Sequence, residues 1–460
     1  TSFFYYSFRL QHATASHNTM LKPVRNQEGD LQYSAPAIAA VHRSSLASVG
    51  VEPSVAATSD AGQRDMFVRA LRAGEADPPH QPPSRPGGPP TASSLSSADS
   101  LSRTITYSEL RRALKKCNLD SAPGADQLSY RILTLMHPSA LRVLLALFNL
   151  CLSSGVVPEA WCTAVVRPLF KGDALNDPFG PLDVDNYRGI SLTSCVGKLL
   201  EKIIATRIEK HVAEHSPLCD TQNGFRRKRS ALTQVWNLTE TLAARGPNSL
   251  VIFFDLKKAF PSVRRSSLLS SLYARGIRGP LWHLVAAYYD NTKGAIRIGE
   301  YLDTVTYPIS NGVKEGSLLS PLLFVLFIDE LLWKVKEAGL GHSLEGYGGR
   351  PVWAGMFGYA DDLAAMPRSV EDAQRLLDVC GDFALSHVCR FSHEKTVVML
   401  MRPAPDLASY PGVIRLSLRR KADRTSSWIR PLMVVSSYKY LGVLLHHSGS
   451  LSQHVKKVVR

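Results

Sequence analysis

The chain has 460 residues, 45% of them hydrophobic, which allows a sizeable core and two to four structural units. Residues 1–100 hold eight basic and eight acidic side chains, so the whole net charge of +15 falls after residue 100. A basic body suits a polyanionic partner such as nucleic acid, although a solvated basic surface has the same composition. The seven scattered cysteines argue against a disulfide scaffold or a structural zinc site, and favour reduced thiols in an intracellular protein.

The first hundred residues differ from the rest of the chain. Residues 1–103 are predicted to be a largely disordered N-terminal segment, because residues 77–102 consist mostly of Pro, Gly and Ser. A short helix is expected near Arg64–Ala73. The chain shows no cleavable signal peptide and no initiator Met, so we expect a fragment of a longer protein.

A helical lead-in is predicted over residues 104–155. Thr106 and Glu109 have the spacing of a capping box, which begins a basic helix at residues 108–116. A second, apolar helix is expected at residues 140–152, closed by Gly155. The most apolar stretch of the chain, residues 318–333, contains polar residues, whereas a membrane span needs about 20 apolar ones. We therefore expect a buried helix there and no membrane partner.

The second half of the chain mixes helices with strands. Helical spacing is found at residues 196–212 and 370–386. Residues 356–366 are apolar around an acidic centre, which favours a hairpin with carboxylates at its tip. Because strands and helices mix without strict alternation, the predicted fold class is α+β. The predicted strands are residues 165–170, 250–254, 396–401 and 440–445.

Three aspartates are the strongest candidates for chemistry. Asp255 ends a predicted strand, and Asp361 and Asp362 lie at the tip of the predicted hairpin. If the two strands are neighbours, the three carboxylates converge and repel one another unless a divalent cation neutralises them. Hard oxygen ligands favour Mg²⁺. A metal site is therefore predicted, whereas a single Asp at a strand end is more commonly a turn residue.

The residues around these acids resemble the motifs of reverse transcriptases, and the motifs follow one another in the family's order. Residues 357–362 (FGYADD) resemble the Y/F-x-D-D signature, and residues 254–260 (FDLKKAF) resemble the first catalytic-Asp motif. The resemblance is to the non-LTR retrotransposon (LINE-like) type and covers about residues 120–455. The other matching segments are 185–192 (DNYRGISL), 224–230 (GFRRKRS), 311–321 (NGVKEGSLLSP), 393–396 (HEKT) and 440–442 (YLG).

The resemblance implies a right-hand polymerase fold, with fingers and palm at residues 156–445 and the start of a truncated thumb at residues 446–460. It implies an RNA-directed DNA polymerase that joins deoxynucleoside triphosphates to the 3′-hydroxyl of a DNA primer on an RNA template. Two Mg²⁺ ions, or Mn²⁺, would be the cofactors, and the nucleus would be the location.

The resemblance also implies roles for individual residues. Asp255 and Asp361 would ligate the metal ions, with Asp362 close by, and the ring of Phe260 would exclude a 2′-hydroxyl. Each role has an alternative. Lys171 could be an exposed loop charge, and Phe260 could be a core aromatic. The basic run at residues 226–229 could be a solvated or nuclear-targeting patch. The residues expected at the nucleotide are Lys171, Arg188, Phe260, Glu315, Gly316 and Lys395. Those expected at the template or primer are Arg226, Arg227, Arg229, Tyr440, Leu441 and Gly442.

Two positions depart from the family's pattern. Glu315 stands where Gln is usual, and an ionised Glu can only accept hydrogen bonds. Pro261 follows Phe260 where Asp is common, and Pro removes a backbone N–H. They leave open a catalytically weak or dead retroelement remnant that acts as a nucleic-acid-binding scaffold. Another right-hand polymerase, such as an intron maturase or an RNA-dependent RNA polymerase, is the second alternative.

Overall fold

The structure is a computed structural model that describes residues 23–49, 59–73, 101–171, 180–346, 349–403 and 431–450. Its helices are α2 Ala35–Val49, α3 Asp60–Arg72, α5 Tyr107–Lys115, α6 Tyr130–Leu135, α7 Pro138–Ser154, α8 Glu159–Cys162, α9 Cys195–His215, α10 Ala231–Arg245, α11 Ala259–Ser262, α12 Arg265–Ala274, α13 Gly279–Asp290, α14 Ser320–Glu337 and α15 Val370–His387, with 3₁₀ turns η1 Gly180–Leu182 and η2 Val184–Asn186. Its strands are β1 Val24–Arg25, β2 Leu31–Gln32, β3 Thr163–Phe170, β4 Tyr187–Leu192, β5 Ser249–Phe254, β6 Lys293–Ile298, β7 Tyr301–Pro308, β8 Ser343–Glu345, β9 Pro351–Trp353, β10 Met356–Tyr359, β11 Asp362–Ala365, β12 Val397–Met401, β13 Met433–Val434, β14 Ser437–Tyr440 and β15 Val443–His446. This mixture confirms the predicted α+β class.

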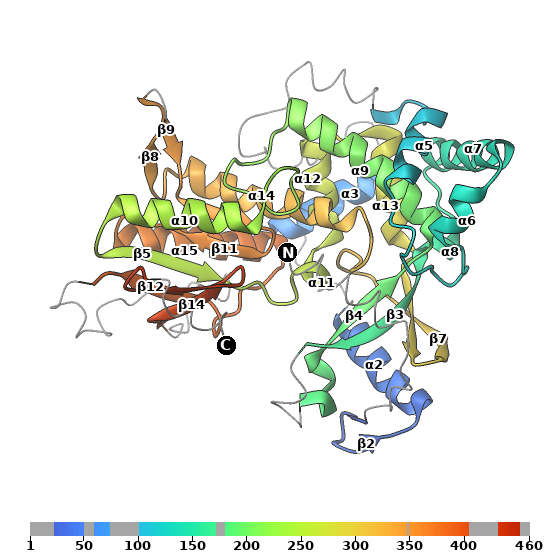
Figure 1. Ribbon diagram of the computed structural model, residues 1–460, viewed down its shortest axis with the longest axis horizontal. Helices are drawn as coiled ribbons and strands as arrows, with labels where there is room; N and C mark the ends of the chain where they lie inside the picture. The colour runs from blue at the N-terminus through green and yellow to red at the C-terminus, as the bar shows by residue number, and fades with distance from the viewer. Residues whose placement is uncertain are drawn as a thin grey trace.

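Two sheets organise the molecule, and they lie well apart in Figure 1. The larger has the strand order β10-β11-β5-β12-β13, with β5 antiparallel to both of its neighbours. The smaller has the order β4-β3-β6-β7, and helix α2 packs on it through Ala39. The larger sheet carries the predicted acidic residues, and the smaller one carries Arg188.

Strand β5 is buried on both faces, which explains its continuous apolar sequence. Ile252 and Phe254 face the main core, which includes α14 and α15. Val251 and Phe253 face the other way, into a second core with α10 and the β14–β15 hairpin. Because side chains alternate along a strand, one run of apolar residues fills both cores.

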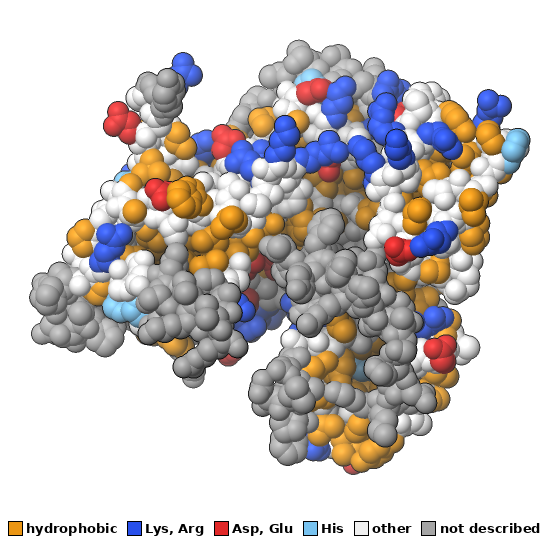
Figure 2. Space-filling model, viewed as in Figure 1, with side chains coloured by type: hydrophobic (Ala, Val, Ile, Leu, Met, Phe, Trp, Pro, Cys, Tyr) orange, Lys and Arg blue, Asp and Glu red, His pale blue; other side chains and the backbone are white. Residues whose placement is uncertain are grey.

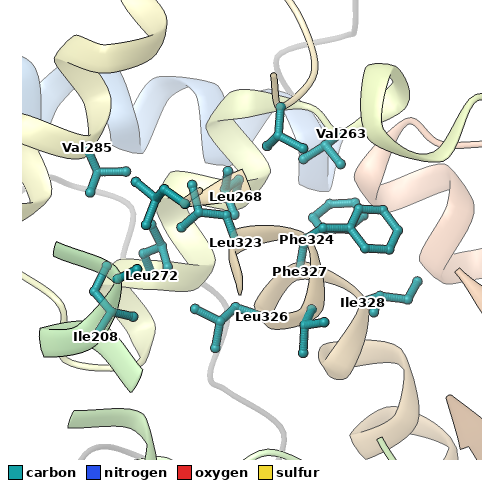
Figure 3. Close-up of a cluster of buried hydrophobic side chains, with 14 of the residues drawn as sticks. Ile208, Val263, Leu268, Leu272, Val285, Leu323, Phe324, Leu326, Phe327 and Ile328 are labelled. Carbon is teal, nitrogen blue, oxygen red and sulfur yellow. The ribbon is translucent and has the colours of Figure 1, made fainter. Parts of the chain in front are cut away.

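Helix α14 lies at the centre of the main core, as Figure 3 shows. Leu323 and Phe327 of this helix are fully buried, together with Leu268 and Leu272 of α12 and Ile208 of α9. The prediction of a buried helix at residues 318–333 is confirmed. Within the described parts of the chain, no helix is both long and apolar enough to cross a membrane. All seven cysteines are free thiols, as expected.

Several local predictions are confirmed. Thr106 Oγ1 accepts a hydrogen bond from the Glu109 N–H at 3.2 Å, and Glu109 Oε2 accepts one from the Thr106 N–H at 2.9 Å, so the capping box is complete. Helix α7 ends at Gly155, whose φ of 65° is left-handed. Helix α15 begins after Ser369, whose hydroxyl accepts from the Asp372 N–H.

The prediction of a largely disordered N-terminal segment is wrong for the part that the structure describes. Helix α2 forms there, although no helix was expected at its position. Helix α3 confirms the short helix expected near Arg64–Ala73, and its Phe67, Val68 and Leu71 are buried. Arg64 of α3 also pairs with Glu330 of α14 at 3.0 Å. Tertiary contacts thus offset the ordering entropy that composition alone left unopposed. The Pro-rich run up to residue 100 and the thumb residues 451–460 lie outside the described residues.

The strand predicted at residues 440–445 is also wrong as a single element. Strand β14 ends at Tyr440 and β15 begins at Val443, and the two pair as a hairpin. The turn between them consists of Leu441 with φ of 48° and Gly442 with φ of 88°. Two consecutive positive φ angles end an extended strand and suit a two-residue hairpin turn.

Candidate active site

Strand pairing brings the predicted aspartates together. Leu363 of β11 pairs with Phe254 of β5, so the next residues outward, Asp362 and Asp255, lie opposite one another. Asp361 precedes Asp362 in the tight turn between β10 and β11. The predicted hairpin with acidic residues at its tip is therefore confirmed, and its neighbour in the sheet is the strand that ends at Asp255.

Where β5 and β11 pair, it is electrostatically unfavourable for all three Asp side chains to be ionised without a cation. Desolvation raises the pKa of Asp362 to about 7, and the charges of Asp361 and Asp255 add to the shift. Desolvation also raises the pKa of Asp361, where Asp255 acts in the same direction and Arg188 opposes it. Repulsion among these carboxylates falls when a cation binds between them.

The carboxylates at this edge of the sheet provide only some of the oxygen ligands that a hard divalent cation needs. Within the ranges that the structure describes, no group of three or more Asp, Glu, His or Cys side chains is arranged to hold a metal ion. Mg²⁺ usually takes only one or two carboxylates and completes its shell with water and substrate phosphates. Asp255 and Asp361 fit that use as a pair, so metal binding at this edge stays a prediction.

A residue that sequence reasoning missed holds the acidic turn. The side-chain oxygen of Gln222 accepts hydrogen bonds from the backbone N–H groups of Ala360 at 3.1 Å and Gly224 at 2.8 Å. The neighbouring Asn223 N–H donates to Gly358 O at 2.7 Å. A Cβ atom on Gly224 would lie 2.2 Å from Ala360 N, so only glycine permits this approach. The only sequence signal was the position of Gln222 beside the motif at residues 224–230.

The predicted phosphate-binding cations Arg188 and Lys171 both lie within electrostatic reach of Glu315, and Arg188 also lies within reach of Asp361. Arg188 stands on β4, and Lys171 follows β3, where its Nζ donates to Asp185 O at 3.0 Å. Desolvation raises the pKa of Glu315, and the nearby charges of Arg188 and Lys171 lower it. In the structure, the charges of Lys171, Arg188 and Asp361 therefore all act on the Glu315 carboxyl group.

Gly316 has a packing role that the sequence did not reveal. Its φ is 111°, and a Cβ atom there would lie 2.1 Å from Ser191 O of β4. The Ser191 N–H donates to Glu315 O at 2.9 Å, which fastens the loop to β4. Gly316 is therefore required by the contact between its loop and the smaller sheet, whether or not a nucleotide is bound.

Phe260 lies in α11, the short helix that follows β5 and Asp255 in the chain. Its ring stacks on Phe324 with centroids 4.9 Å apart and is edge-on to Phe225 at 6.5 Å. Only 8% of Phe260 is exposed, so it serves as a core aromatic. Its predicted contact with the sugar of a nucleotide stays a prediction.

The basic run at residues 226–229 divides into two kinds of side chain. Arg226 donates to the carbonyl oxygens of Cys219 at 3.0 Å and Gln222 at 2.8 Å, and Arg229 donates to Asn223 Oδ1 at 3.1 Å. These two arginines brace their own loop. Arg227 is exposed, so of the three arginines predicted to contact the template it is the most available.

The predicted primer-binding residues also divide. The Tyr440 side chain is 1% exposed, and its hydroxyl accepts from Gln234 Nε2 at 3.2 Å and donates to Asp362 O at 3.5 Å. Tyr440 therefore supports the strand of Asp362 from within the core instead of presenting its ring to a primer. Gly442 is exposed at the hairpin turn. Lys395 is exposed, and its charge opposes the desolvation that raises the pKa of Asp255.

Comparisons with known proteins agree with this geometry. Residues 176–445 match the family described as reverse transcriptase (RNA-dependent DNA polymerase). The chain is 27% identical over 371 residues to the RNA-directed DNA polymerase from mobile element jockey of Drosophila melanogaster, a match that covers 77% of this chain and 36% of that protein. It is 30% identical over 265 residues to the Pol polyprotein from type-1 retrotransposable element R2 of Popillia japonica, covering 57% of this chain and 34% of that protein. The chain thus spans about a third of the length of these relatives.

Proposed function

This chain belongs to the reverse transcriptase family, in the company of non-LTR retrotransposon polymerases, and we propose that it extends a DNA primer with deoxynucleotides on an RNA template. The observation that carries the proposal is the β5–β11 pairing. It sets Asp255 opposite Asp362 and beside the turn that holds Asp361. In a right-hand polymerase the larger sheet would belong to the palm and the smaller one to the fingers.

The side chains suggest a division of labour at the reacting phosphate. Asp255 and Asp361 would hold divalent ions, and Asp362 would add negative charge beside them. Bound there, two Mg²⁺ ions would lower the pKa of the attacking 3′-hydroxyl and stabilise the charge on the pentavalent phosphate and the leaving pyrophosphate. Arg188 would bind the triphosphate with a bidentate fork and Lys171 with a compact charge.

Glu315 bears on how active this chain is. Its carboxylate lies within the field of Arg188 and Lys171, the two cations proposed for the triphosphate. A phosphate group arriving there must compete with this carboxylate for the same cations. We therefore expect weaker nucleotide binding than with Gln at this position. Metal binding should be retained, because Glu315 is not one of the proposed metal ligands.

Primer extension tests the proposal. The protein is given a DNA primer annealed to an RNA template, with deoxynucleotides and Mg²⁺, and template–primer binding is measured separately. Asp361→Asn should slow extension by at least about a hundredfold without weakening template–primer binding, because only the reacting centre loses stabilisation. Asp382→Asn, at an exposed position of α15, is the matched control and should extend normally.

Each other outcome favours an alternative. If the parent protein binds template–primer but adds no nucleotide, it is a nucleic-acid-binding scaffold. If it prefers ribonucleotides, it belongs with another class of right-hand polymerase. If Asp361→Asn and Asp382→Asn extend equally well, the acidic turn is not the reacting centre.

A further inference from the structure

We propose that Glu201 of α9 and the buried Lys314 position the loop at residues 314–318, and that they thereby determine how tightly the active site binds a deoxynucleoside triphosphate. This inference rests on the proposed function, in which Glu315 of this loop lies beside the cations that bind the triphosphate. Glu201 and Lys314 are only 3% and 4% exposed, so neither side chain contacts the nucleotide itself. They are positioning residues, which act through the loop.

The carboxylate of Glu201 holds the end of the loop that leads into α14. Its Oε2 accepts hydrogen bonds from the Ser317 hydroxyl at 2.8 Å and from the Leu318 N–H at 2.9 Å. The Ser317 hydroxyl in turn accepts from the N–H groups of Leu319 and Ser320, at 3.1 and 3.2 Å, where α14 begins. A helix start favours a negative charge and leaves N–H groups in need of acceptors, so an ionised Glu201 suits this position.

Lys314, at the other end of the loop, is a buried cation. Figure 2 shows Lys and Arg side chains gathered at the surface, whereas Lys314 is enclosed by α13. Its Nζ lies 5.7 Å from the ring centroids of both Tyr288 and Tyr289, and it has no hydrogen-bond acceptor among the described residues. Desolvation lowers the pKa of Lys314, and the negative charge of Glu201 is the strongest influence in the opposite direction. A buried ammonium group is costly without a compensating charge, so Lys314 depends on Glu201.

The residue between these two anchors faces the active site. Glu315 directly follows Lys314, and its carbonyl oxygen accepts the Ser191 N–H of β4 at 2.9 Å. The charges of Arg188 and Lys171 act on the Glu315 carboxyl group, so its side chain lies on the side of the proposed triphosphate cations. A loop that must be ordered again whenever a ligand binds costs affinity. A loop fixed at both ends therefore favours nucleotide binding.

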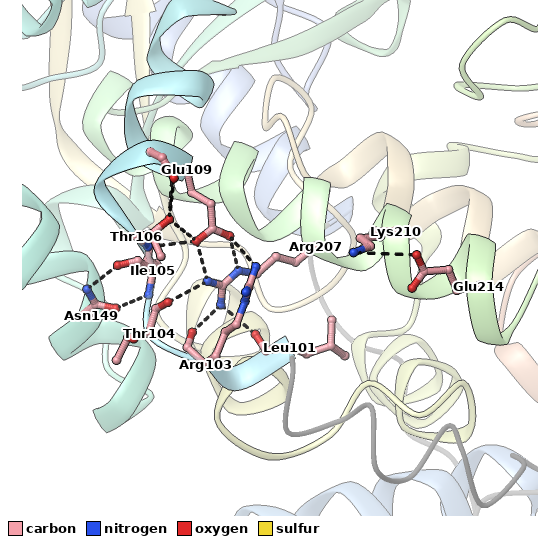
Figure 4. A network of polar contacts seen from close by, with 11 residues as sticks. Leu101, Arg103, Thr104, Ile105, Thr106, Glu109, Asn149, Arg207, Lys210 and Glu214 are labelled. Carbon is pink, nitrogen blue, oxygen red and sulfur yellow. Dashed lines mark hydrogen bonds and ion pairs between the residues drawn. The ribbon is translucent and has the colours of Figure 1, made fainter.

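Helix α9 gives the Glu201 carboxylate a fixed support, as Figure 4 shows for Arg207 on the same helix. Arg207 forms two hydrogen bonds with the carboxylate of Glu109 on α5, at 3.0 and 3.1 Å. Its other N–H groups donate to carbonyl oxygens of the segment before α5 at 2.7–3.2 Å. Leu200 and Ile204, on either side of Glu201 along α9, are buried in the main core. Because α9 is held in this way, the loop takes its position from Glu201.

The test measures binding of a deoxynucleoside triphosphate to the protein on an RNA template whose DNA primer lacks a 3′-hydroxyl, so that no bond forms. Glu201→Gln keeps a side-chain oxygen for the two hydrogen bonds but removes the charge that compensates Lys314. The nucleotide concentration for half-saturation should rise by at least about tenfold, while template–primer binding stays unchanged. Adding Lys314→Met removes the uncompensated cation as well, and should restore half-saturation to within about threefold of the parent.

Two further variants separate the loop from general effects on the core. Lys198 is also buried within the field of Glu201, but it lies on α9 and not on the loop. Lys198→Met combined with Glu201→Gln is therefore the matched control and should not restore nucleotide binding. Ser317→Ala keeps both charges and removes one hydrogen bond to Glu201, and should raise the half-saturating concentration by about threefold or more. It carries the test if Glu201→Gln does not fold.

Several outcomes would overturn the proposal. They are unchanged nucleotide binding in Glu201→Gln or, where that variant does not fold, in Ser317→Ala; an equal loss of template–primer binding; and no restoration by Lys314→Met. Equal restoration by Lys198→Met would show that any buried charge near Glu201 has the same effect, and would also reject the role of the loop. Because the readout is binding, a parent that binds nucleotide but does not extend an ordinary primer would reject the proposed function and keep the positioning role. A parent that binds no nucleotide would reject both.

Discussion

The side-chain oxygen of Gln222 lies 3.1 Å from the backbone nitrogen of Ala360, the residue directly before Asp361. Ala360 has a φ of 58°, in the left-handed region that residues other than glycine seldom occupy. Gln222 is fully buried, so the hydrogen bond is shielded from water. A strained turn that carries a candidate metal ligand is thus held by a side chain from a distant segment.

We expect Gln222→Met to reduce nucleotide addition by at least about tenfold while template–primer binding is retained. Methionine has a similar length but cannot accept the Ala360 N–H, so the turn that carries Asp361 is free to relax. Leaving the N–H groups of Ala360 and Gly224 without this acceptor should also lower the free energy of unfolding, by about 1–3 kcal/mol for each group. Single-turnover extension and urea unfolding measure the two effects. If stability falls but the rate of addition does not, Gln222 supports only the fold.

Gly316→Ala should destabilise the protein by about 3 kcal/mol or more, because the new Cβ atom would overlap Ser191 O. Gly246→Ala is the matched control. Its φ is 77°, and a Cβ atom added there would have no neighbouring atom within 4 Å, so it should cost only the backbone strain of about 1–2 kcal/mol. Urea unfolding of both variants isolates the contribution of the close approach. Equal losses would show that backbone strain alone explains the requirement for glycine.

Local sequence patterns were sufficient to predict most elements near the site. The capping box of Thr106 and Glu109, the apolar run that ends at Asp255 and the hairpin around Asp361 all depend on neighbours in the sequence. Their geometry follows from propensity and periodicity, and the family's motifs added their order along the chain.

Long-range contacts could not be predicted in the same way. Gln222 meets Ala360 across more than a hundred residues, and nothing in its neighbours indicates that pairing. Tyr440 was expected at the template or primer, yet packing of its hairpin on Phe253 buries it. Helix α3 was expected from its own sequence, but its ion pair with Glu330 of α14 and its hydrogen bond with Arg264, just before α12, were not.

The capping carboxylate of Glu109 should make stability fall in acid. Burial alone would raise its pKa, but hydrogen bonds from Arg207 and Thr106 and the charge of Arg207 hold the pKa at about 2, below the usual 4.5. The folded protein thus binds fewer protons than the unfolded chain between these values. The stabilisation is complete above pH 4.5 and is lost as the pH falls toward 2.

Glu109→Gln should therefore lower the free energy of unfolding by about 1–3 kcal/mol at pH 6 and flatten the dependence on pH below 4.5. Urea unfolding at a series of pH values measures both quantities. Glu240→Gln, at an exposed position of α10, should leave the curve as it is in the parent. An acid slope that is unchanged in Glu109→Gln would mean that other carboxylates cause it.

Two arginines of α3 allow a direct comparison of buried and exposed ion pairs. Arg64 and Glu330 lie 3.0 Å apart with side chains 2% and 10% exposed, whereas Arg72 and Asp290 lie 2.8 Å apart with side chains 37% and 42% exposed. Desolvation would raise the pKa of Glu330, yet the charges of His387 and Arg64 hold it well below its usual range. Glu330 therefore stays ionised in the core and depends on these partners.

Arg64→Met should lower the free energy of unfolding by about 3–5 kcal/mol, because it leaves the Glu330 carboxylate in the core with His387 and the i+4 Lys334 as its remaining partners. Arg72→Met should cost less than about 1 kcal/mol, since water and salt screen the exposed pair. Urea unfolding measures the two losses, and limited proteolysis shows whether α3 has detached. If Arg64→Met is no more costly than Arg72→Met, α3 is not anchored through Glu330. A large difference would show that α3 is an integral part of the folded domain, because losing its ion pair destabilises α14 at the centre of the core.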